Sequence, residues 1–406
     1  MSFIPFNLPT IDDDEVREVV DTLKSGWLTT GPKTAQFEKE FKDYVGASHA
    51  LAVNSATSAM HLALAALGLG PGDEVITTPI TFCATVNTIL QVGATPVLAD
   101  VGADGNIDPA SIAARLTPRT RAIMPVHIGG LSCDMTSIWR IAREHRLYVI
   151  EDAAHAVGTQ YKDLQIGSDR DGSGGRSDAV CFSFYATKNL TTGEGGMVVT
   201  PDETLFNKMK VLCLHGISKD AWNRYSDKGN WYYEVEECGF KYNLSDVLSS
   251  IGIHQLRKLE KFTEQRTALA RTYNQGFAGS PEIELPPDSP DNRHCWHLYA
   301  IRLNLDRLNI GRDAFIRELR QREIGTSVHF IPIPLHPAYA SLAKLPQNHC
   351  PRAIALYERL ISLPLYPAMT EEQVRRVIHA VKEIAASHRV SLQAGSPIDT
   401  VAAQSD

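Results

Sequence analysis

The sequence has 406 residues, of which 43% are hydrophobic and 21% are charged, and its formal net charge at pH 7 is −7. These values are typical of a globular protein with two or three domain-sized units, and the acidic balance argues against a nucleic-acid partner, which requires a basic surplus or stripe. No apolar run reaches the length of about 18 residues that a membrane span needs, and the acidic start of the chain lacks the basic region of a signal peptide.

The N-terminal part of the chain is expected to form two helices joined by a rigid loop. Apolar residues recur at helical spacing over 15–23 and again over 34–44, and Ser25 and Gly26 interrupt the pattern. The partly apolar segment Trp27–Gly31 lies between the helices. It is either a packing loop or a wall of a substrate site, and the residues leave both roles open.

A short strand at 50–53 and an apolar helix at 57–67 follow. The start of this helix carries Ser55, Thr57 and Ser58, so it offers free backbone amides and hydroxyl groups at its positive end. A phosphate group suits such an end. Serine and threonine also begin helices simply as caps, so this pattern by itself does not establish a phosphate site.

Strands and helices alternate from residue 74 to residue 150. The predicted order is strand 74–78, helix 84–92, strand 96–100, helix 109–116, strand 121–126, helix 137–145 and strand 147–150. Continuous apolar strands separated by helices indicate a mostly parallel sheet that is covered on both faces, which is an α/β fold. Phe82 and His127 each follow a strand, so both are candidates for the edge of the sheet as well as for the core.

Two strands in the next stretch are followed by residues with reactive side chains. The strand 147–150 is followed by Asp152, and the strand 179–184 is followed by Lys188. If these strands are neighbours, their carboxyl ends place the carboxylate and the amine side by side in a crevice. Such a pair most often forms only a salt bridge. The alternative is a pyridoxal 5'-phosphate site, in which the lysine binds the aldehyde and the aspartate pairs with the ring nitrogen.

The residues after Lys188 favour the pyridoxal-phosphate site over a simple salt bridge. The turn Thr191–Gly196 and the apolar run Met197–Val199 follow it, and a solvated ion pair needs neither. The lysine must lose a proton to react, which a crowded, partly desolvated site promotes. A plain NAD-binding protein would need a GxGxxG motif after the first strand, and this chain has none there.

The remaining chain predicts an aromatic loop and a second domain. After a helix at 205–212 comes the loop Trp222–Tyr233, whose many aromatic side chains indicate an interface or a specificity loop. A long helix then runs toward Leu259. The segments expected beyond it are helix 262–277, a proline-rich boundary at 279–292, strand 297–303, helix 312–322, strand 326–330 and a last helix that starts with a capping box at Thr370–Gln373. We predict a large domain at 1–260, a small α+β domain at 261–390 and a disordered tail at 391–406.

Several motifs together resemble one enzyme family. EDAAHAVG (151–158), SFYATKN (183–189) and GEGG (193–196) are similar to segments of the sugar-nucleotide aminotransferases of the DegT/DnrJ/EryC1/StrS group. The resemblance extends from about Gly26 to SLPLYP (362–367), which is nearly the whole chain. Within the group, the chain is most similar to the branch that contains UDP-4-amino-4-deoxy-L-arabinose aminotransferase and related enzymes that aminate C4 of UDP-linked keto-sugars.

The resemblance implies a fold-type I pyridoxal-phosphate enzyme with a seven-stranded, mostly parallel sheet between helices. It also implies a homodimer with a shared active site. The implied catalytic residues are Lys188 and Asp152. The implied cofactor contacts are Ala56, Thr57 and Ser183 at the phosphate, Phe82 on the ring face, His155 at the phenolic oxygen, Asp152, Lys188, and Asn243 reaching the partner's phosphate. The candidate substrate contacts are Trp27, Thr29, Tyr185, His215 and His329.

The implied reaction transfers an amino group from L-glutamate, which becomes 2-oxoglutarate, to C4 of a UDP-linked keto-sugar, for amino-sugar or cell-surface glycan synthesis such as that of lipopolysaccharide. An enzyme on the same scaffold could instead aminate C3 of a sugar nucleotide or a keto-cyclitol. A dehydratase variant of the family lacks the lysine, so Lys188 argues against it. A transcription regulator would need a further DNA-binding domain and a more basic charge.

The cysteines indicate the redox state of the compartment and whether a metal site is expected. Seven cysteines are scattered along the chain without a CxxC pair, which favours reduced thiols over a disulfide framework or a zinc site. We therefore expect a cytoplasmic protein without a metal site.

Overall fold

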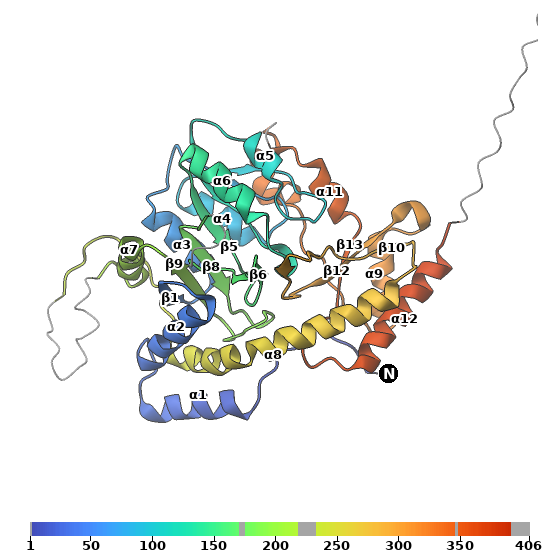
Figure 1. Ribbon diagram of the computed structural model, residues 1–406, viewed down its shortest axis with the longest axis horizontal. Helices are drawn as coiled ribbons and strands as arrows, with labels where there is room; N and C mark the ends of the chain where they lie inside the picture. The colour runs from blue at the N-terminus through green and yellow to red at the C-terminus, as the bar shows by residue number, and fades with distance from the viewer. Residues whose placement is uncertain (1, 170–174, 218–232, 346–347, 391–406) are drawn as a thin grey trace, which may run out of the picture.

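The computed structural model describes residues 2–169, 175–217, 233–345 and 348–390 (Figure 1). Most of the predicted loop Trp222–Tyr233, and the predicted tail 391–406, lie outside these ranges. The helices are α1 (Asp13–Ser25), α2 (Pro32–Val45), α3 (Ala56–Ala66), α4 (Cys83–Gln91), α5 (Pro109–Ala113), α6 (Met135–His145), α7 (Glu203–Cys213), α8 (Asp246–Phe277), α9 (Arg312–Gln321), α10 (Ala340–Ala343), α11 (Pro351–Tyr357) and α12 (Glu371–Ser387). Among these described helices, none is long and apolar enough to cross a membrane.

A seven-stranded sheet lies at the centre of the large part of the molecule, in the order β1-β9-β8-β5-β4-β2-β3. Its strands are β1 (His49–Val53), β2 (Glu74–Thr77), β3 (Thr95–Leu98), β4 (Thr120–Met124), β5 (Tyr148–Asp152), β8 (Ala179–Ser183) and β9 (Gly196–Thr200). Only β9 runs antiparallel to its neighbours, β1 and β8, whereas the other pairs are parallel. The predicted α/β class and the mostly parallel seven-stranded sheet are confirmed.

Helices cover both faces of this sheet because successive strand residues point to opposite sides. In β8, Val180 and Phe182 pack into a core with α2, α6 and α8. The alternate residues Ala179 and Cys181 pack into a second core with α3, α4 and α7. The strands are therefore apolar on both faces, as expected of a doubly covered sheet.

The C-terminal part contains an antiparallel sheet in the order β10-β12-β13, formed by β10 (Ile283–Glu284), β12 (Tyr299–Leu303) and β13 (Leu360–Leu363). A third small sheet joins β11 (Asn292–Arg293), β6 (Gln160–Tyr161) and β7 (Leu164–Gln165). The predicted strand at 326–330 is wrong. Ser327 forms only an isolated bridge to Ser362, and β13 supplies the third strand because its Ile361 and Leu363 are fully buried.

Helix α8 replaces two predicted helices with one continuous helix of 32 residues. The residue pattern of the helix changes near residue 261 because its two halves pack against different neighbours. Its first half packs against α1 and α2, and its second half packs against α12 (Figure 1). The predicted domain boundary between residues 260 and 261 falls inside this helix. The predicted capping box between Thr370 and Gln373 begins α12, as expected.

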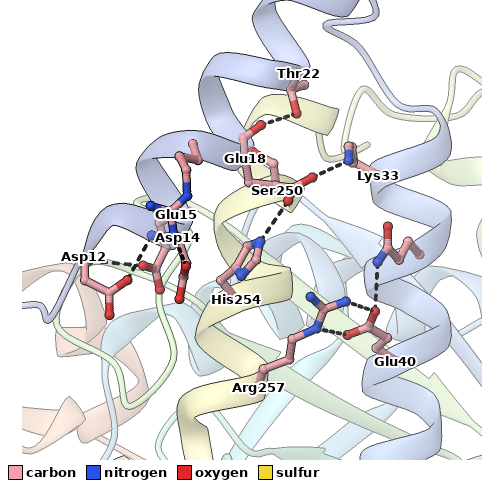
Figure 2. A network of polar contacts seen from close by, with 12 residues as sticks. Asp12, Asp14, Glu15, Glu18, Thr22, Lys33, Glu40, Ser250, His254 and Arg257 are labelled. Carbon is pink, nitrogen blue, oxygen red and sulfur yellow. Dashed lines mark hydrogen bonds and ion pairs between the residues drawn. The ribbon is translucent and has the colours of Figure 1, made fainter.

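Polar contacts bind α1 and α2 to the first half of α8 (Figure 2). Glu18 of α1 pairs with Lys33 of α2 and, at 2.8 Å, with His254 of α8. Arg257 of α8 pairs with Glu40 of α2 at 2.7 Å. These partly exposed pairs set the orientation of the helices and contribute little stability each.

The buried carboxylate of Asp246, at the start of α8, caps the start of α2. It accepts backbone N–H groups from Gly31 at 2.7 Å, Lys33 at 3.0 Å and Thr34 at 2.9 Å. It also accepts the hydroxyl of Thr34 at 2.7 Å. These donors are the otherwise unpaired amides of a helix start, where a negative charge is favourable. The loop 27–31 is thereby fixed to α8.

We predict that Asp246→Ala lowers the free energy of unfolding by about 3 kcal/mol, because it leaves several buried donors without an acceptor. Urea unfolding followed by circular dichroism measures this change. The control Asp43→Ala removes an exposed carboxylate of α2 that pairs with Lys39, and it should change the stability by less than about 0.5 kcal/mol. Equal effects of the two substitutions would contradict the capping role.

Candidate active site

A cavity of about 490 Å³ lies at the carboxyl ends of β5 and β8. Nine residues that the sequence analysis named line it together: Ala56, Thr57, Phe82, Asp152, His155, Ser183, Tyr185, Lys188 and His329. They come from the start of α3, the start of α4, the ends of β5 and β8, and the segment before β13. The expected juxtaposition of Asp152 and Lys188 follows from the parallel pairing of β5 with β8.

The carboxylate of Asp152 is held by groups behind it. The hydroxyl of Thr85 donates to Oδ2 at 2.7 Å, and the amide of Ala154 donates to Oδ1 at 3.1 Å. Burial raises the pKa of Asp152, and these two hydrogen bonds together with the charge of Lys188 partly offset that rise. A buried carboxylate of this kind is stabilised by a cationic N–H group in front of it.

The side chain of Lys188 is half-buried and lines the cavity together with Asp152. Burial lowers the pKa of Lys188 to about 8, and the charge of Asp152 opposes this change. Among the described residues, its Nζ has no hydrogen-bond partner. Near neutral pH this lysine therefore exchanges readily between its charged and neutral forms, as a nucleophile or a general base requires.

The start of α3 forms a pocket of donors. Ser55 caps the helix by accepting the amide of Ser58 at 3.0 Å, which leaves the amides of Ala56 and Thr57 for another acceptor. β9 approaches this turn so closely that a Cβ at Gly196 would lie 2.5 Å from the carbonyl carbon of Ser55. Only glycine permits this approach, and free amides at a helix start are suited to an anion.

His155 has a defined tautomer. Its Nδ1 accepts the backbone amide of Gly129 at 3.2 Å, so the neutral ring carries its proton on Nε2. Burial, followed by the charges of Lys188 and His329, holds the pKa of His155 well below its usual value. Its ring stacks on Phe330 with centroids 5.6 Å apart. His155 therefore acts as a neutral donor in the cavity.

Aromatic side chains surround the mouth of the cavity. Phe82 is 61% exposed and Tyr185 is 48% exposed, so neither is a core residue. Phe6 stacks on His329 with centroids 5.3 Å apart, and both line the cavity. His329 is also anchored by Ser362, whose hydroxyl lies 2.9 Å from Nδ1. These residues offer flat surfaces to a ligand.

Within the described part of the chain, four of the named residues do not line this cavity: Trp27, Thr29, His215 and Asn243. They lie along the segment 240–246. The amide of His215 donates to the carbonyl of Phe240 at 2.7 Å, and Nδ2 of Asn243 donates to the hydroxyl of Thr30 at 2.7 Å. The indole of Trp27 donates to the carbonyl of Thr30 at 3.2 Å. These four residues therefore do not contact a ligand bound in the cavity of the same chain.

The candidate role of His127 at the sheet edge is wrong. Its Nε2 lies 2.7 Å from the carboxylate of Glu151, and its Nδ1 accepts the amide of Cys133 at 3.1 Å. Both ring nitrogens are thus satisfied in the core, where His127 is fully buried.

Sequence reasoning missed other residues of the site. Phe6, His297 and Phe330 line the cavity, and Thr85 supports Asp152. Ser55, which the sequence placed at the candidate phosphate site, lines the cavity as well. The threonine-rich segment around Thr85 gave a weak signal. Phe6 and His297 gave none, because they are far away in sequence and their neighbours suggest only packing.

The donor set fits pyridoxal phosphate. The free amides at the start of α3 suit the phosphate, the carboxylate of Asp152 suits the ring nitrogen, and Lys188 suits the aldehyde. Among the described residues, no group of three or more histidine, cysteine or acidic side chains is arranged to hold a metal ion.

Residues 9–382 match the profile of the DegT/DnrJ/EryC1/StrS aminotransferase family. The spore coat polysaccharide biosynthesis protein SpsC of Bacillus subtilis (strain 168) is 50% identical over 384 residues, covering 94% of this chain and 97% of that protein. Spr1654 from Streptococcus pneumoniae, assigned as a sugar aminotransferase and solved in its PLP form, is 32% identical with a TM-score of 0.87, over 95% of this chain and 99% of that one. PseC of Helicobacter pylori, an aminotransferase involved in the biosynthesis of pseudoaminic acid, is 31% identical with a TM-score of 0.87, over 95% of this chain and 100% of that one.

We predict that Lys188 reacts with an amine-selective reagent at unusually low pH. Amines react only as free bases, so its rate should rise with pH and level off above about 8, where the buried amine is neutral. Peptide mass spectrometry after brief labelling measures the rate. Lys39 is the internal control, because the hydrogen bond and charge of Asp43 raise its pKa above the usual value of 10.5. A midpoint for Lys188 near that of Lys39 would contradict the prediction.

Proposed function

Because the chain belongs to the DegT/DnrJ/EryC1/StrS aminotransferase family, we propose that it transfers an amino group from L-glutamate to the keto group of a nucleotide-linked sugar, with pyridoxal phosphate as cofactor. The chain is an aminotransferase, as its family and its solved neighbours are. The observation that carries the proposal is one cavity that holds a lysine of lowered pKa, a buried aspartate and a helix start with free amides. The three together match the three polar ends of the cofactor.

The cofactor would be held at three points. The amides of Ala56 and Thr57 and the hydroxyl of Ser183 would bind its phosphate, and Asp152 would pair with its ring nitrogen. When bound, pyridoxal phosphate accepts the electrons of the bond broken at the amino carbon and carries the amino group between the two substrates.

The residues around the cofactor would manage protons. The carboxylate of Asp152, fixed by Thr85, would hold a proton on the ring nitrogen by accepting its hydrogen bond. Nε2–H of His155 would donate to the phenolic oxygen. Nζ of Lys188, with a pKa of about 8, would take a proton from the substrate carbon and return it, as a general base and acid near neutral pH.

The aromatic mouth supports a sugar-nucleotide substrate. The exposed rings of Phe82 and Tyr185 and the half-buried ring of Phe6 suit a sugar ring or a nucleobase, which both pack on aromatic surfaces. SpsC is a protein of spore coat polysaccharide biosynthesis, and PseC is involved in the biosynthesis of pseudoaminic acid. We therefore propose a UDP-linked 4-keto sugar, aminated at C4, for a cell-surface glycan.

We propose a reducing, cytoplasmic location for this reaction. All seven cysteines are free, and Cys133, Cys181, Cys213, Cys295 and Cys350 are buried. Free thiols in this number are typical of a reducing compartment.

We also propose that the active form is a homodimer with shared sites. The named residues that miss this chain's own cavity, Asn243 among them, lie together along segment 240–246 and are available to a second copy. The adjacent side chains of Leu23, Trp27 and Leu28 are 52%, 41% and 49% exposed. Apolar groups exposed beside a polar cluster are typical of an interface between subunits.

The test of the function is the visible spectrum of the protein loaded with pyridoxal phosphate, before and after L-glutamate is added. We expect a visible band that glutamate bleaches and that Lys188→Ala lacks, although this variant should remain folded. A protein that gains no visible band would contradict the proposal. Restoration of the band by a panel of UDP- and dTDP-linked keto-sugars would then separate C4 amination from C3 or keto-cyclitol amination.

For the shared site, we predict that Asn243→Ala and Lys188→Ala homodimers are each nearly inactive. Mixed after dissociation, they should recover roughly a quarter of the wild-type activity, because half of the dimers are mixed and each holds one intact site of two. Steady-state assays of the reassembled mixture measure this. Absence of recovery, with reassembly verified by native mass spectrometry, would rule out a site that Asn243 shares with a second copy.

A further inference from the structure

His297 lines the cavity beside Lys188, in a segment where the sequence predicts only a strand. Strand β12 begins later, at Tyr299. His297 is 5% exposed, and its ring centroid lies 4.3 Å from that of His155. Burial, followed by the charges of His155 and Lys188, holds the pKa of His297 well below its usual value. A neutral histidine therefore lies next to the lysine.

The hydrogen bonds of Asn189 determine which nitrogen of His297 carries the proton. Nδ2 of Asn189 donates to the carbonyl of Cys295 at 3.0 Å, so its Oδ1 is left to accept. This Oδ1 lies 3.1 Å from Nδ1 of His297, which therefore donates. The neutral ring then has a bare lone pair on Nε2. The amide of Asn189 and the ring of His297 therefore each have one orientation that satisfies these hydrogen bonds.

These bonds hold the chain directly beside Lys188. Asn189 follows the lysine, and its partners lie more than 100 residues further along the chain, with the carbonyl acceptor 106 residues away. On the other side, Nδ2 of Asn7 donates to the carbonyl of Thr187 at 3.0 Å, across 180 residues. The lysine is thus held between the N-terminal segment and a segment that lies far along the chain. Its own turn contributes the hydrogen bond from the amide of Lys188 to the carbonyl of Tyr185 at 2.9 Å, and these tertiary contacts fix where that turn lies.

We propose that His297 and Asn189 are positioning residues for Lys188, which hold its turn so that Nζ meets the aldehyde of pyridoxal phosphate. This inference rests on the function proposed above. In that step the neutral Nζ attacks the aldehyde carbon, a C=N bond forms and one water leaves. The rate depends on where Nζ lies, so a displaced turn slows the step without preventing the cofactor from binding.

His297 and Asn189 act on Lys188 through its position rather than through charge. The groups whose charge acts on the lysine and the pair include Asp152 on β5, His155 after it, His329 before β13 and Arg266 on α8. Tyr185 and Glu194 line the same cavity. Burial lowers the pKa of His155 and that of His297, and it lowers the pKa of His329 to about 4. All three rings are neutral at neutral pH, so the pair holds the lysine without adding charge.

Two probes separate positioning from general structure. Pyridoxal phosphate attaches to the lysine and gives a visible band, whereas pyridoxamine phosphate has no aldehyde and binds without attaching. We expect His297→Phe and Asn189→Ala to slow attachment to the apoprotein about tenfold. The dissociation constant of pyridoxamine phosphate should stay within about twofold of wild type. His297→Asn keeps an amide donor at the place of Nδ1 and should recover the rate to within about threefold.

His294→Phe is the matched control. His294 is also buried, lies in the same segment and stacks on Trp296 at 4.0 Å, but it lines a smaller neighbouring cavity of about 50 Å³. Its attachment rate should equal that of wild type. Stopped-flow absorbance measures all rates, and Asn189→Ala provides the test if His297→Phe does not fold.

Three results would overturn the inference. One is wild-type attachment in both His297→Phe and Asn189→Ala. Another is a loss of pyridoxamine phosphate affinity that matches the loss of rate, since this would show a merely structural role. The third is a His297→Asn rate as low as that of His297→Phe. If wild type itself gains no visible band, the proposed function falls and the inference falls with it, whereas the other results leave the function intact.

Discussion

The parallel pairing of β5 with β8 is the constraint on which the active site depends. Asp152 lies opposite Cys181 in this pair, and the amide of Ala153 donates to the carbonyl of Cys181 at 2.9 Å. Both strands therefore end at one edge of the sheet, and the turn after β8 brings Lys188 to the carboxylate. A slip of one residue would turn Asp152 to the other face of the sheet. Two covered faces, each with its own core, make such a slip costly.

Burial acts in opposite directions on the two central groups. It raises the pKa of Asp152 and lowers the pKa of Lys188, so each loses part of its preference for the charged form. Each of the two groups is therefore stabilised further by a partner of opposite charge that enters the cavity. A ligand that brings a cationic nitrogen and an anionic phosphate supplies the missing partners, and its binding then stabilises the fold.

The sequence predicted those parts of the molecule that local patterns determine. Alternating apolar strands and helices indicated the sheet, and the residues at two strand ends indicated Asp152 and Lys188. The mostly apolar run around His297 indicated a strand, and nothing local shows that Asn189 binds it. Helix α8 was divided at residue 261 because its charge pattern changes there, although the chain contains no proline between Asp246 and Phe277. What the sequence did not show are contacts between distant segments.

The uninterrupted course of α8 has a mechanical consequence. A helix of 32 residues is about 48 Å long, and without proline it has no built-in point for a sharp kink. It binds the first two helices at one end and α12 at the other (Figure 1). Swinging the C-terminal sheet away from the central sheet would require this helix to bend along its length. The continuous helix thus favours access to the cavity through displacement of exposed side chains at its mouth, such as Phe82 and Tyr185, over a hinge between the two sheets.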